Sequence, residues 1–446
     1  MDFLPHTTED DRAMLDALGL DALDDLFDAV PAAVRLDRPL DVPRALSEPE
    51  LLEHLRELAG RSRARALRCF AGGGFYDHHV PAAVRSLATR AEFATSYTPY
   101  QAELSQGVLQ ALFEFQSVIC EIYGMEVANA SLYDGAASVV EGVNLALRVT
   151  HRDKVLVGST VNPHYRQVLE TYTSGLGVEV LTVRADESGV VDWSQADADE
   201  AGAVVAASPN FFGRLEDMAQ AAECAHSAGA LLVAVTDPTA MGILEAPGHL
   251  DADVAAGEGQ SLGNPMSYGG PAVGLFATKL DHVRQVPGRI AGETTDADGR
   301  RGYVLTLQAR EQHIRRARAT SNVCTNQTLL AIAAGIYLSW LGPQGLRRLG
   351  EICARRTAYA AARLAEVPGL TLRFDGPRFK EVVVETAAPA AQIIAALAAR
   401  GFLVGPDLGR WYPGLRKCLL VAVTERRTAE HIDELAEAFG KELAER

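Results

Sequence analysis

The stretch LLVAVTDP, residues 231–238, indicates how this chain is built. Its continuous apolar run ends at Asp237 and Pro238, which predicts a strand buried on both faces and followed by a turn. Helical stretches separate most of the similar runs, which are KVLVG (154–158), VEVLTV (178–183), AVVAAS (203–208), DVAAG (253–257) and VGLFAT (273–278). This alternation predicts an α/β fold with a mostly parallel, doubly wound sheet, in which ligands bind at the carboxyl ends of the strands.

The sequence predicts three parts. Residues 1–69 have leucines at helical spacing, and SEPELLEHLREL (47–58) adds a Ser cap and an early Pro, so we expect an N-terminal helical extension. Residues 70–325 contain the strands above and form a large α/β domain. Residues 326–446 contain a linking helix and a second set of strands, which predicts a smaller C-terminal α/β domain.

Composition argues against several classes of function. The formal net charge of −16 disfavours a nucleic-acid partner, because phosphate binding needs a basic surface. The cysteines form no CxxC pair and the adjacent His78 and His79 have no third ligand at metal spacing, so we expect reduced thiols and no metal. The N-terminus lacks signal-peptide features, and LLAIAAGIYLSWL (329–341) is shorter than the roughly 20 residues of a bilayer span. We therefore expect a cytoplasmic protein without a membrane partner, and a buried helix at 329–341.

One helix start could bind an anion. YDGAAS (133–138) precedes a predicted helix, where Gly135, Ala136 and Ala137 could offer free backbone N–H groups to a phosphate. The alternative is a helix start whose small residues only allow close packing. Taken alone, the motif does not decide between these two interpretations.

Two further side chains fit a pyridoxal-phosphate site, which needs a group that stacks on the ring and a carboxylate for the ring nitrogen. His164 in NPHYR (162–166) follows a predicted strand and could lie flat on a pyridine ring. Asp237 ends its strand where a carboxylate can pair with a protonated ring nitrogen. The simpler alternatives are a hydrogen-bonded surface or core histidine and an Asp-Pro turn cap.

The lysine that would hold this cofactor covalently is missing. In such enzymes it lies about 20 to 30 residues beyond the carboxylate, and the corresponding window, GEGQSLGNPMS (257–267), contains no lysine. The nearest candidate, Lys279, follows the next predicted strand. The sequence therefore predicts a pyridoxal-enzyme fold without a covalent cofactor site of its own.

Six segments resemble a known family. They are AGGGFYDHHVP (71–81), SYTPYQAELSQGVLQALFEFQ (96–116), ANASLYDGAAS (128–138), NPHYRQVLETY (162–172), GEGQSLGNPMSYGGP (257–271) and REQHIRRARATSNVCTNQ (310–327). The family is glycine dehydrogenase (decarboxylating), the P-protein of the glycine cleavage system, and the closer resemblance is to its separate alpha subunit, or subunit 1. The similar segments run from near the N-terminus towards the C-terminal lobe.

This resemblance implies a fold-type I pyridoxal-phosphate-dependent transferase fold and a divided active site. Pyridoxal phosphate is expected on a paralogous beta subunit and not covalently on this chain, with αβ pairs that assemble as α2β2. The implied reaction removes carbon dioxide from glycine and passes the aminomethyl group to the lipoyl group of the H-protein. The remains of a cofactor site on alpha would then be Gly135, Ala136, Ala137, His164 and Asp237.

The segment SYTPYQ (96–101) is the candidate for a direct role in the beta subunit's site. We expect Tyr97, Thr98, Tyr100 and Gln101 to line its glycine or lipoyl channel, although they could equally pack only at the subunit interface. RRARAT (315–320) is a candidate contact for an acidic H-protein. Two other functions stay open: a non-catalytic structural or regulatory paralogue, and a free-standing pyridoxal-phosphate lyase that uses Lys279.

Overall fold

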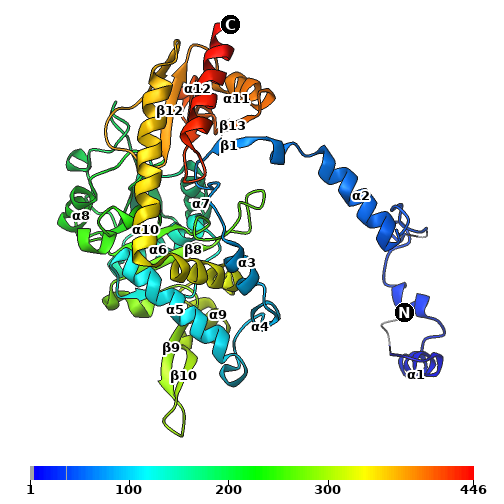
Figure 1. Cartoon of the computed structure of the whole chain (residues 1–446). Helices are drawn as coiled ribbons and strands as arrows, with labels where there is room; N and C mark the ends of the chain where they lie inside the picture. Colours follow the sequence, from blue (N-terminus) through cyan, green and yellow to red (C-terminus); the bar gives the residue numbers. More distant parts are fainter. Residues whose placement is uncertain (1–4, 37, 446) are drawn as a thin grey trace. The chain divides into compact units, whose positions relative to one another are not determined.

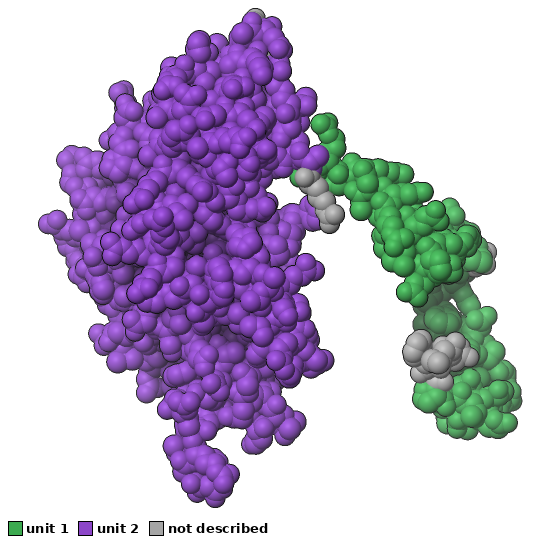
Figure 2. Space-filling view, in the orientation of Figure 1, with its two compact units in different colours: residues 1–64 green, residues 65–446 purple. Residues whose placement is uncertain are grey.

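The computed structural model describes residues 5–36 and 38–445, and the chain forms two compact units, Met1–Ala64 and Arg65–Arg446 (Figure 2). The first unit contains α1 (Thr8–Leu18) and α2 (Glu48–Arg61). Ser47 and Glu50 form a capping box at α2, as expected for a helix in this stretch. Among the described residues of this unit only Leu15 is buried, so the unit has almost no core of its own.

A seven-stranded sheet forms the centre of the second unit, in the order β2-β8-β7-β6-β5-β3-β4. The strands are β2 (Val127–Ala128), β3 (Lys154–Gly158), β4 (Glu179–Val183), β5 (Ala203–Ala207), β6 (Leu231–Val235), β7 (Val254–Glu258) and β8 (Gly274–Thr278). The neighbours from β7 to β4 are parallel, and only β8 runs against its two partners. The predicted mostly parallel sheet is confirmed.

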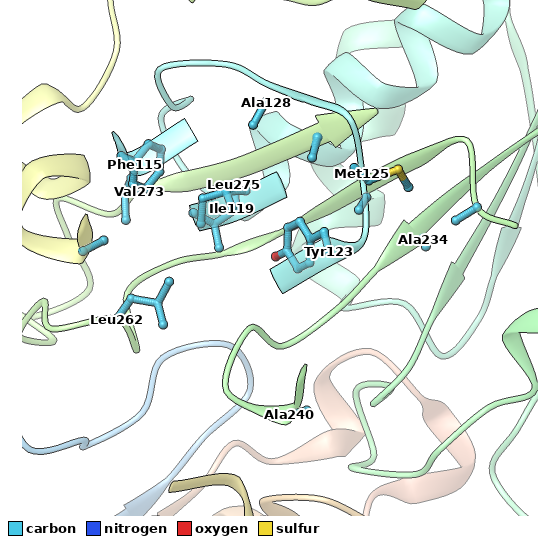
Figure 3. Packing of buried hydrophobic residues seen from close by; sticks show 14 of the residues in the cluster. Phe115, Ile119, Tyr123, Met125, Ala128, Ala234, Ala240, Leu262, Val273 and Leu275 are labelled. Carbon is cyan, nitrogen blue, oxygen red and sulfur yellow. The ribbon is translucent and has the colours of Figure 1, made fainter. Parts of the chain in front are cut away.

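Helices cover both faces of this sheet. In β6, Val233 and Val235 pack in one apolar cluster with α6 (Gly135–Thr150) and α7 (Pro163–Thr173). Leu232 and Ala234 point to the opposite cluster with α5 (Gln106–Tyr123) and α8 (Met218–Ser227). Figure 1 labels β8 and the helices α5, α6 and α7 around it. Figure 3 shows part of that second cluster, in which side chains of α5 lie close to those of β8. The sheet is therefore doubly wound, as predicted.

The apolar run at 329–341 belongs to α10 (Thr328–Ala365), which bends at Gly342, where φ is 62° and ψ is 178°. Within the described residues, α10 is the one helix long and apolar enough to cross a membrane by length and composition. It packs against α3 (Ala82–Ala88) and α5, and Ala331, Ala334 and Tyr337 are buried. The expected buried helix is present.

A second, smaller sheet lies in the C-terminal part of the unit and contains β11 (Leu370–Leu372), β12 (Glu381–Thr386) and β14 (Cys418–Ala422) in antiparallel order. Helices α11 (Ala390–Ala399) and α12 (Ala429–Ala444) pack beside it. Strand β1 (Arg68–Ala71) pairs in parallel with β13 (Phe402–Gly405), so the end of the predicted N-terminal extension lies in this lobe. The division into 1–69, 70–325 and 326–446 stays a prediction.

The remaining α-helices and strands border the segment 96–101 or belong to the hairpin formed by β9 and β10. They are α4 (Ala91–Ala94), the antiparallel pair β9 (Ile290–Thr295) and β10 (Arg301–Thr306), and α9 (Gln312–Arg315). The side-chain amide of Gln106, at the start of α5, donates a hydrogen bond to the Tyr303 carbonyl and accepts one from the Tyr303 backbone N–H. These two hydrogen bonds connect α5 to β10.

Candidate functional site

A small cavity of about 70 Å³ lies at the carboxyl ends of β5, β6 and β7. Parallel strands end at the same edge of a sheet, so the residues that follow them meet there. The lining residues are Gly74, Tyr76, Asn162, Tyr165, Ala207, Pro209, Asn210, Phe211, Val235, Thr236, Asp237, Glu258, Ser261 and Glu381. The cavity is therefore in the place that the fold predicts for a ligand.

Asp237 has a separate partner for each carboxylate oxygen. Its Oδ1 accepts hydrogen bonds from the backbone N–H and the hydroxyl of Thr239, at 2.9 and 2.7 Å, which is the turn cap anticipated above. Its Oδ2 lies 2.5 Å from Nζ of Lys380, whose side chain is 1% exposed. Burial acts to raise the pKa of Asp237, but the Lys380 ammonium keeps this pKa below its ordinary value. Asp237 therefore faces a cation that the chain itself supplies.

The N-terminus of α6 is bonded within the chain. The backbone N–H of Gly135 donates to Oε2 of Glu258 at 2.9 Å, and that of Ala137 donates to Oδ1 of Asp134 at 2.7 Å. Two of the three donors predicted to be free for an anion, those of Gly135 and Ala137, are engaged within the chain, because Asp134 caps the helix and Glu258 ends β7 directly against it. The backbone N–H of Gly135, a candidate phosphate donor, therefore meets a carboxyl group of the chain itself.

Glu258 is held from three sides. Besides Gly135, its oxygens accept from the backbone N–H groups of Gln260, at 2.9 Å, and Val273, at 3.3 Å. Burial raises the pKa of Glu258 to about 8, and these backbone donors only partly offset that effect. Tyr165 also lines the cavity and lies close to Gly135, since a Cβ at Gly135 would lie 2.3 Å from the Tyr165 hydroxyl oxygen.

The smaller lobe closes the cavity with Glu381 and its neighbours. Oε1 of Glu381 accepts from the backbone N–H of Gly73 at 2.7 Å, and burial raises the pKa of Glu381 to about 7. A Cβ at Gly72 would lie 2.4 Å from that same oxygen, so the glycine run in AGGGF serves close backbone approach. Nζ of Lys380 lies 4.1 Å from the centroid of the Tyr76 ring, a cation–π contact inside the protein.

Two predicted residues lie away from this cavity. His164 is exposed, and its ring meets Trp411 edge-on at a centroid distance of 5.1 Å, while Asn162 and Tyr165 line the cavity on either side of it in the sequence. Lys279 lies at the opposite edge of the sheet, where its Nζ contacts Asp251 at 2.8 Å and Asp253 at 2.9 Å. Lys279 therefore cannot serve a reaction at the carboxyl ends of the strands.

His78 belongs to a buried cluster behind the cavity. Its Nδ1 lies 2.6 Å from Oε2 of Glu425, and ligand atoms of His78, Cys353 and Glu425 lie within 4.8 Å of one another. Although burial opposes it, the hydrogen bond to His78 keeps the pKa of Glu425 at about 2. The short contact is that of an internal hydrogen-bonded pair. The expected absence of a metal stays a prediction.

A second group of predicted residues gathers around Arg289, which is 3% exposed. Its Nη2 donates to the Tyr100 hydroxyl at 3.1 Å and to the Cys324 carbonyl at 2.6 Å, and its guanidinium lies 5.1 Å from the Tyr100 ring centroid. Tyr97 is 82% exposed, Thr98 is half-buried and Gln101 is exposed. Arg289 thus fixes SYTPYQ against ATSNVCTNQ (319–327) and leaves Tyr97 at the surface.

Sheet order, double helix cover and a site at the strand ends define the class of protein: the chain has the fold of type I pyridoxal-phosphate-dependent enzymes. A sphingosine-1-phosphate lyase from Burkholderia pseudomallei shares this fold with a TM-score of 0.65 at 17% identity, over 93% of this chain and 94% of that one. A glutamate decarboxylase from Lactobacillus brevis has a TM-score of 0.68 at 12% identity, over 94% and 98% of the two chains.

The chain belongs to the glycine cleavage system P-protein family, whose model matches residues 1–439. It is 49% identical over 443 residues to the probable glycine dehydrogenase (decarboxylating) subunit 1 of Desulforamulus reducens, covering 99% of both chains. The same protein of Moorella thermoacetica is 49% identical over 448 residues, covering 100% of both. A crystal structure of glycine decarboxylase (P-protein) in inhibitor-bound form has a TM-score of 0.90 at 46% identity, over 99% and 100% of the two chains. The predicted family is confirmed.

The residues around the cavity do not fit pyridoxal phosphate as a ligand of this chain. The cavity of about 70 Å³ is far below the roughly 300 Å³ at which ligand pockets begin. The sequence interpretation missed Lys380, Glu258, Glu381 and Tyr76. Glu258 did carry a signal, since it is a carboxyl group at a strand end, near the start of the window 257–267 in which a lysine was expected.

Proposed function

We propose that the chain is the alpha subunit of a two-subunit glycine dehydrogenase (decarboxylating), active in the cytoplasm as a complex with a beta subunit that holds pyridoxal phosphate. In this complex, glycine loses its carboxyl carbon as carbon dioxide. The aminomethyl group passes to the lipoyl disulfide of the H-protein. Two αβ pairs form the α2β2 assembly.

One observation carries the proposal: relatives named as subunit 1 of glycine dehydrogenase match the chain from end to end at 49% identity. The word subunit in those names implies a second chain. The filled pocket at Asp237 and Glu258 supports a partner that holds the cofactor, because GEGQSLGNPMS (257–267) contains no lysine and Lys380 is paired with Asp237. The first unit supports assembly as well, since α2 exposes Leu51, Leu55 and Leu58 along one stripe without a core to bury them.

The proposal assigns SYTPYQ to the beta subunit's glycine or lipoyl channel. Tyr97 presents its ring and hydroxyl at the surface, while Arg289 holds Tyr100 from behind. A rigidly backed, exposed aromatic segment is suited to complete a neighbouring site, since little side-chain motion is lost on binding. Thr98 and Gln101 would contribute polar atoms to the same channel.

The proposal also includes a docking surface for the H-protein. Arg315, Arg316 and Arg318 are exposed, and within the described part of the chain none of them forms an ion pair. On a chain with a net charge of −16, such a cluster favours an acidic partner.

The deciding experiment measures glycine-dependent carbon dioxide exchange with lipoylated H-protein, using this chain alone, the beta subunit alone, and the mixture. We expect activity in the mixture only. Activity of this chain alone would refute the proposal. A Lys279→Met variant serves as a matched control in the mixture and should retain full activity, because Lys279 lies at the far edge of the sheet.

A non-catalytic structural role is the second candidate, favoured by the filled pocket. Tyr97→Phe and Tyr100→Phe distinguish the two. If SYTPYQ lines the partner's channel, we expect a loss of turnover of about 10-fold or more with an intact complex, as for loss of a group used in the transition state. Tyr172→Phe, an exposed tyrosine of α7, is the control. Unchanged turnover in both test variants would favour the structural role.

A further inference from the structure

The two ends of the cavity carry opposite chemistry, as the two ends of pyridoxal phosphate do. At one end the N-terminus of α6, which attracts negative charge, receives the Glu258 carboxyl group. At the other end Asp237, which attracts positive charge, receives the Lys380 ammonium at 2.5 Å. Phosphate and protonated ring nitrogen would need these same two partners.

The side chains that make these contacts are largely enclosed. Lys380 is 1% exposed, and Glu258 is 9% exposed. Each comes from a different part of the chain: Glu258 from the end of β7 and Lys380 from the position just before β12. Burying a carboxyl or ammonium group without a partner costs several kcal/mol, so both contacts are needed for these side chains to be buried.

The backbone at Lys380 supports this interpretation. Its φ is 64°, a left-handed conformation that is unfavourable for a side chain other than glycine. The backbone holds this shape because Val423 donates to the Lys380 carbonyl at 2.7 Å and Phe379 donates to the Gly213 carbonyl at 2.8 Å. A strained lysine whose ammonium meets a buried carboxylate indicates that the fold retains it for its charge.

We infer that Glu258 and Lys380 are built-in replacements for the phosphate and the ring nitrogen of pyridoxal phosphate, so that this pocket is a polar structural core closed to the cofactor. The inference goes beyond the proposed function and does not rest on it, because it concerns this chain alone. A cofactor can then load only onto a partner.

The first test is a titration of the full-length chain, without any partner, with pyridoxine 5′-phosphate. This probe has the phosphate and ring nitrogen but no aldehyde, so it forms no adducts with surface lysines. We expect no saturable binding by equilibrium dialysis up to about 1 mM probe. A Kd of about 1 mM corresponds to a binding free energy of about −4 kcal/mol. Saturable binding of one equivalent within this range would overturn the inference.

The second test is a double-mutant cycle with Lys380→Met, Asp237→Asn and the pair. If the two groups neutralise each other, each single change leaves a buried polar group without its partner. We then expect each single variant to lower the folding equilibrium constant by about 100-fold. The folding equilibrium constant of the double variant should be at least about 10-fold higher than the two single losses combined would give. Additive losses would overturn the inference.

The matched control for this cycle is an exposed pair, Lys441 and Glu437, whose side chains are 66% and 68% exposed and whose charged atoms lie 3.7 Å apart. Its cycle, Lys441→Met with Glu437→Gln, should show a coupling of less than about 3-fold. Neither test measures glycine turnover. Failure of this inference is therefore distinguishable from failure of the proposed function.

Discussion

The pH dependence of the chain's folding stability should reveal the raised pKa of Glu258. Burial raises its pKa from 4.5 to about 8 in the folded chain, so the fold favours the protonated form. Its contribution to stability is fully present below about pH 4.5 and is lost as the pH rises towards 8. Each pH unit within this window costs up to about 1.4 kcal/mol, or roughly 3 kcal/mol between pH 5.5 and 7.5.

The change to test is Glu258→Gln, which removes the titration and keeps the shape. The amide nitrogen cannot accept a hydrogen bond, so either the contact to Gly135 is lost or those to both Gln260 and Val273 are lost. We therefore expect an offset of about 1–3 kcal/mol at low pH together with a flatter pH profile. The slope, rather than the offset, reports on the raised pKa.

Scanning calorimetry of both proteins between pH 5.5 and 7.5 measures this slope. A unit the size of Arg65–Arg446 changes its Tm by roughly 1 °C per kcal/mol. The Tm of the wild type should therefore fall by about 3 °C more than that of the variant across this range. Glu381, whose pKa burial raises to about 7, contributes equally to both proteins and cancels in the comparison. Parallel profiles would refute the reasoning.

Two further changes test other parts of the account. Gly135→Ala places a Cβ 2.3 Å from the Tyr165 hydroxyl oxygen, so we expect the free energy of unfolding in denaturant to fall by about 1–3 kcal/mol. Adding Tyr165→Phe should recover part of this loss, and no recovery would contradict the close contact. Arg316→Glu with Arg318→Glu should raise the KM for H-protein about 5-fold or more at low salt with little change in kcat, whereas Arg347→Glu, whose partner is Glu351, should not. An unchanged KM would count against the docking surface.

The fold was predictable because its main signals are local. Continuous apolar runs such as LLVAV and AVVAA mark strands buried on both faces, and all the strands predicted for the large sheet are present. Gly124 ends α5 in the left-handed conformation, and Ser47 is the N-cap residue of α2, as expected from the residue types. The sequence order of strands and helices then restricts the topology to a doubly wound sheet.

The site was predictable only in part, because its contents depend on contacts between distant segments. Asp237, expected at a strand end, lines the cavity, and the start of α6 meets the cavity-lining Glu258 through the backbone N–H of Gly135. What occupies them was not found, since Lys380 reaches Asp237 from the smaller lobe. No spacing rule links these two positions. The approach of the AGGGF glycines to Glu381 depends on the same packing of lobes.

Lys380 shows how charge and conformation oppose each other in this core. Glycine at position 380 would relieve a backbone cost of about 1–2 kcal/mol at a φ of 64°. It would also leave Asp237 buried without its cation, at a cost of about 3–5 kcal/mol. The electrostatic effect is larger, so Lys380→Gly should destabilise the chain. His151→Gly, at an exposed residue with a φ of 55° that ends α6, should instead stabilise it by about 0.5–1 kcal/mol. Denaturant unfolding of the two variants compares them directly, and stabilisation by both would mean that the charge of Lys380 contributes little to the core.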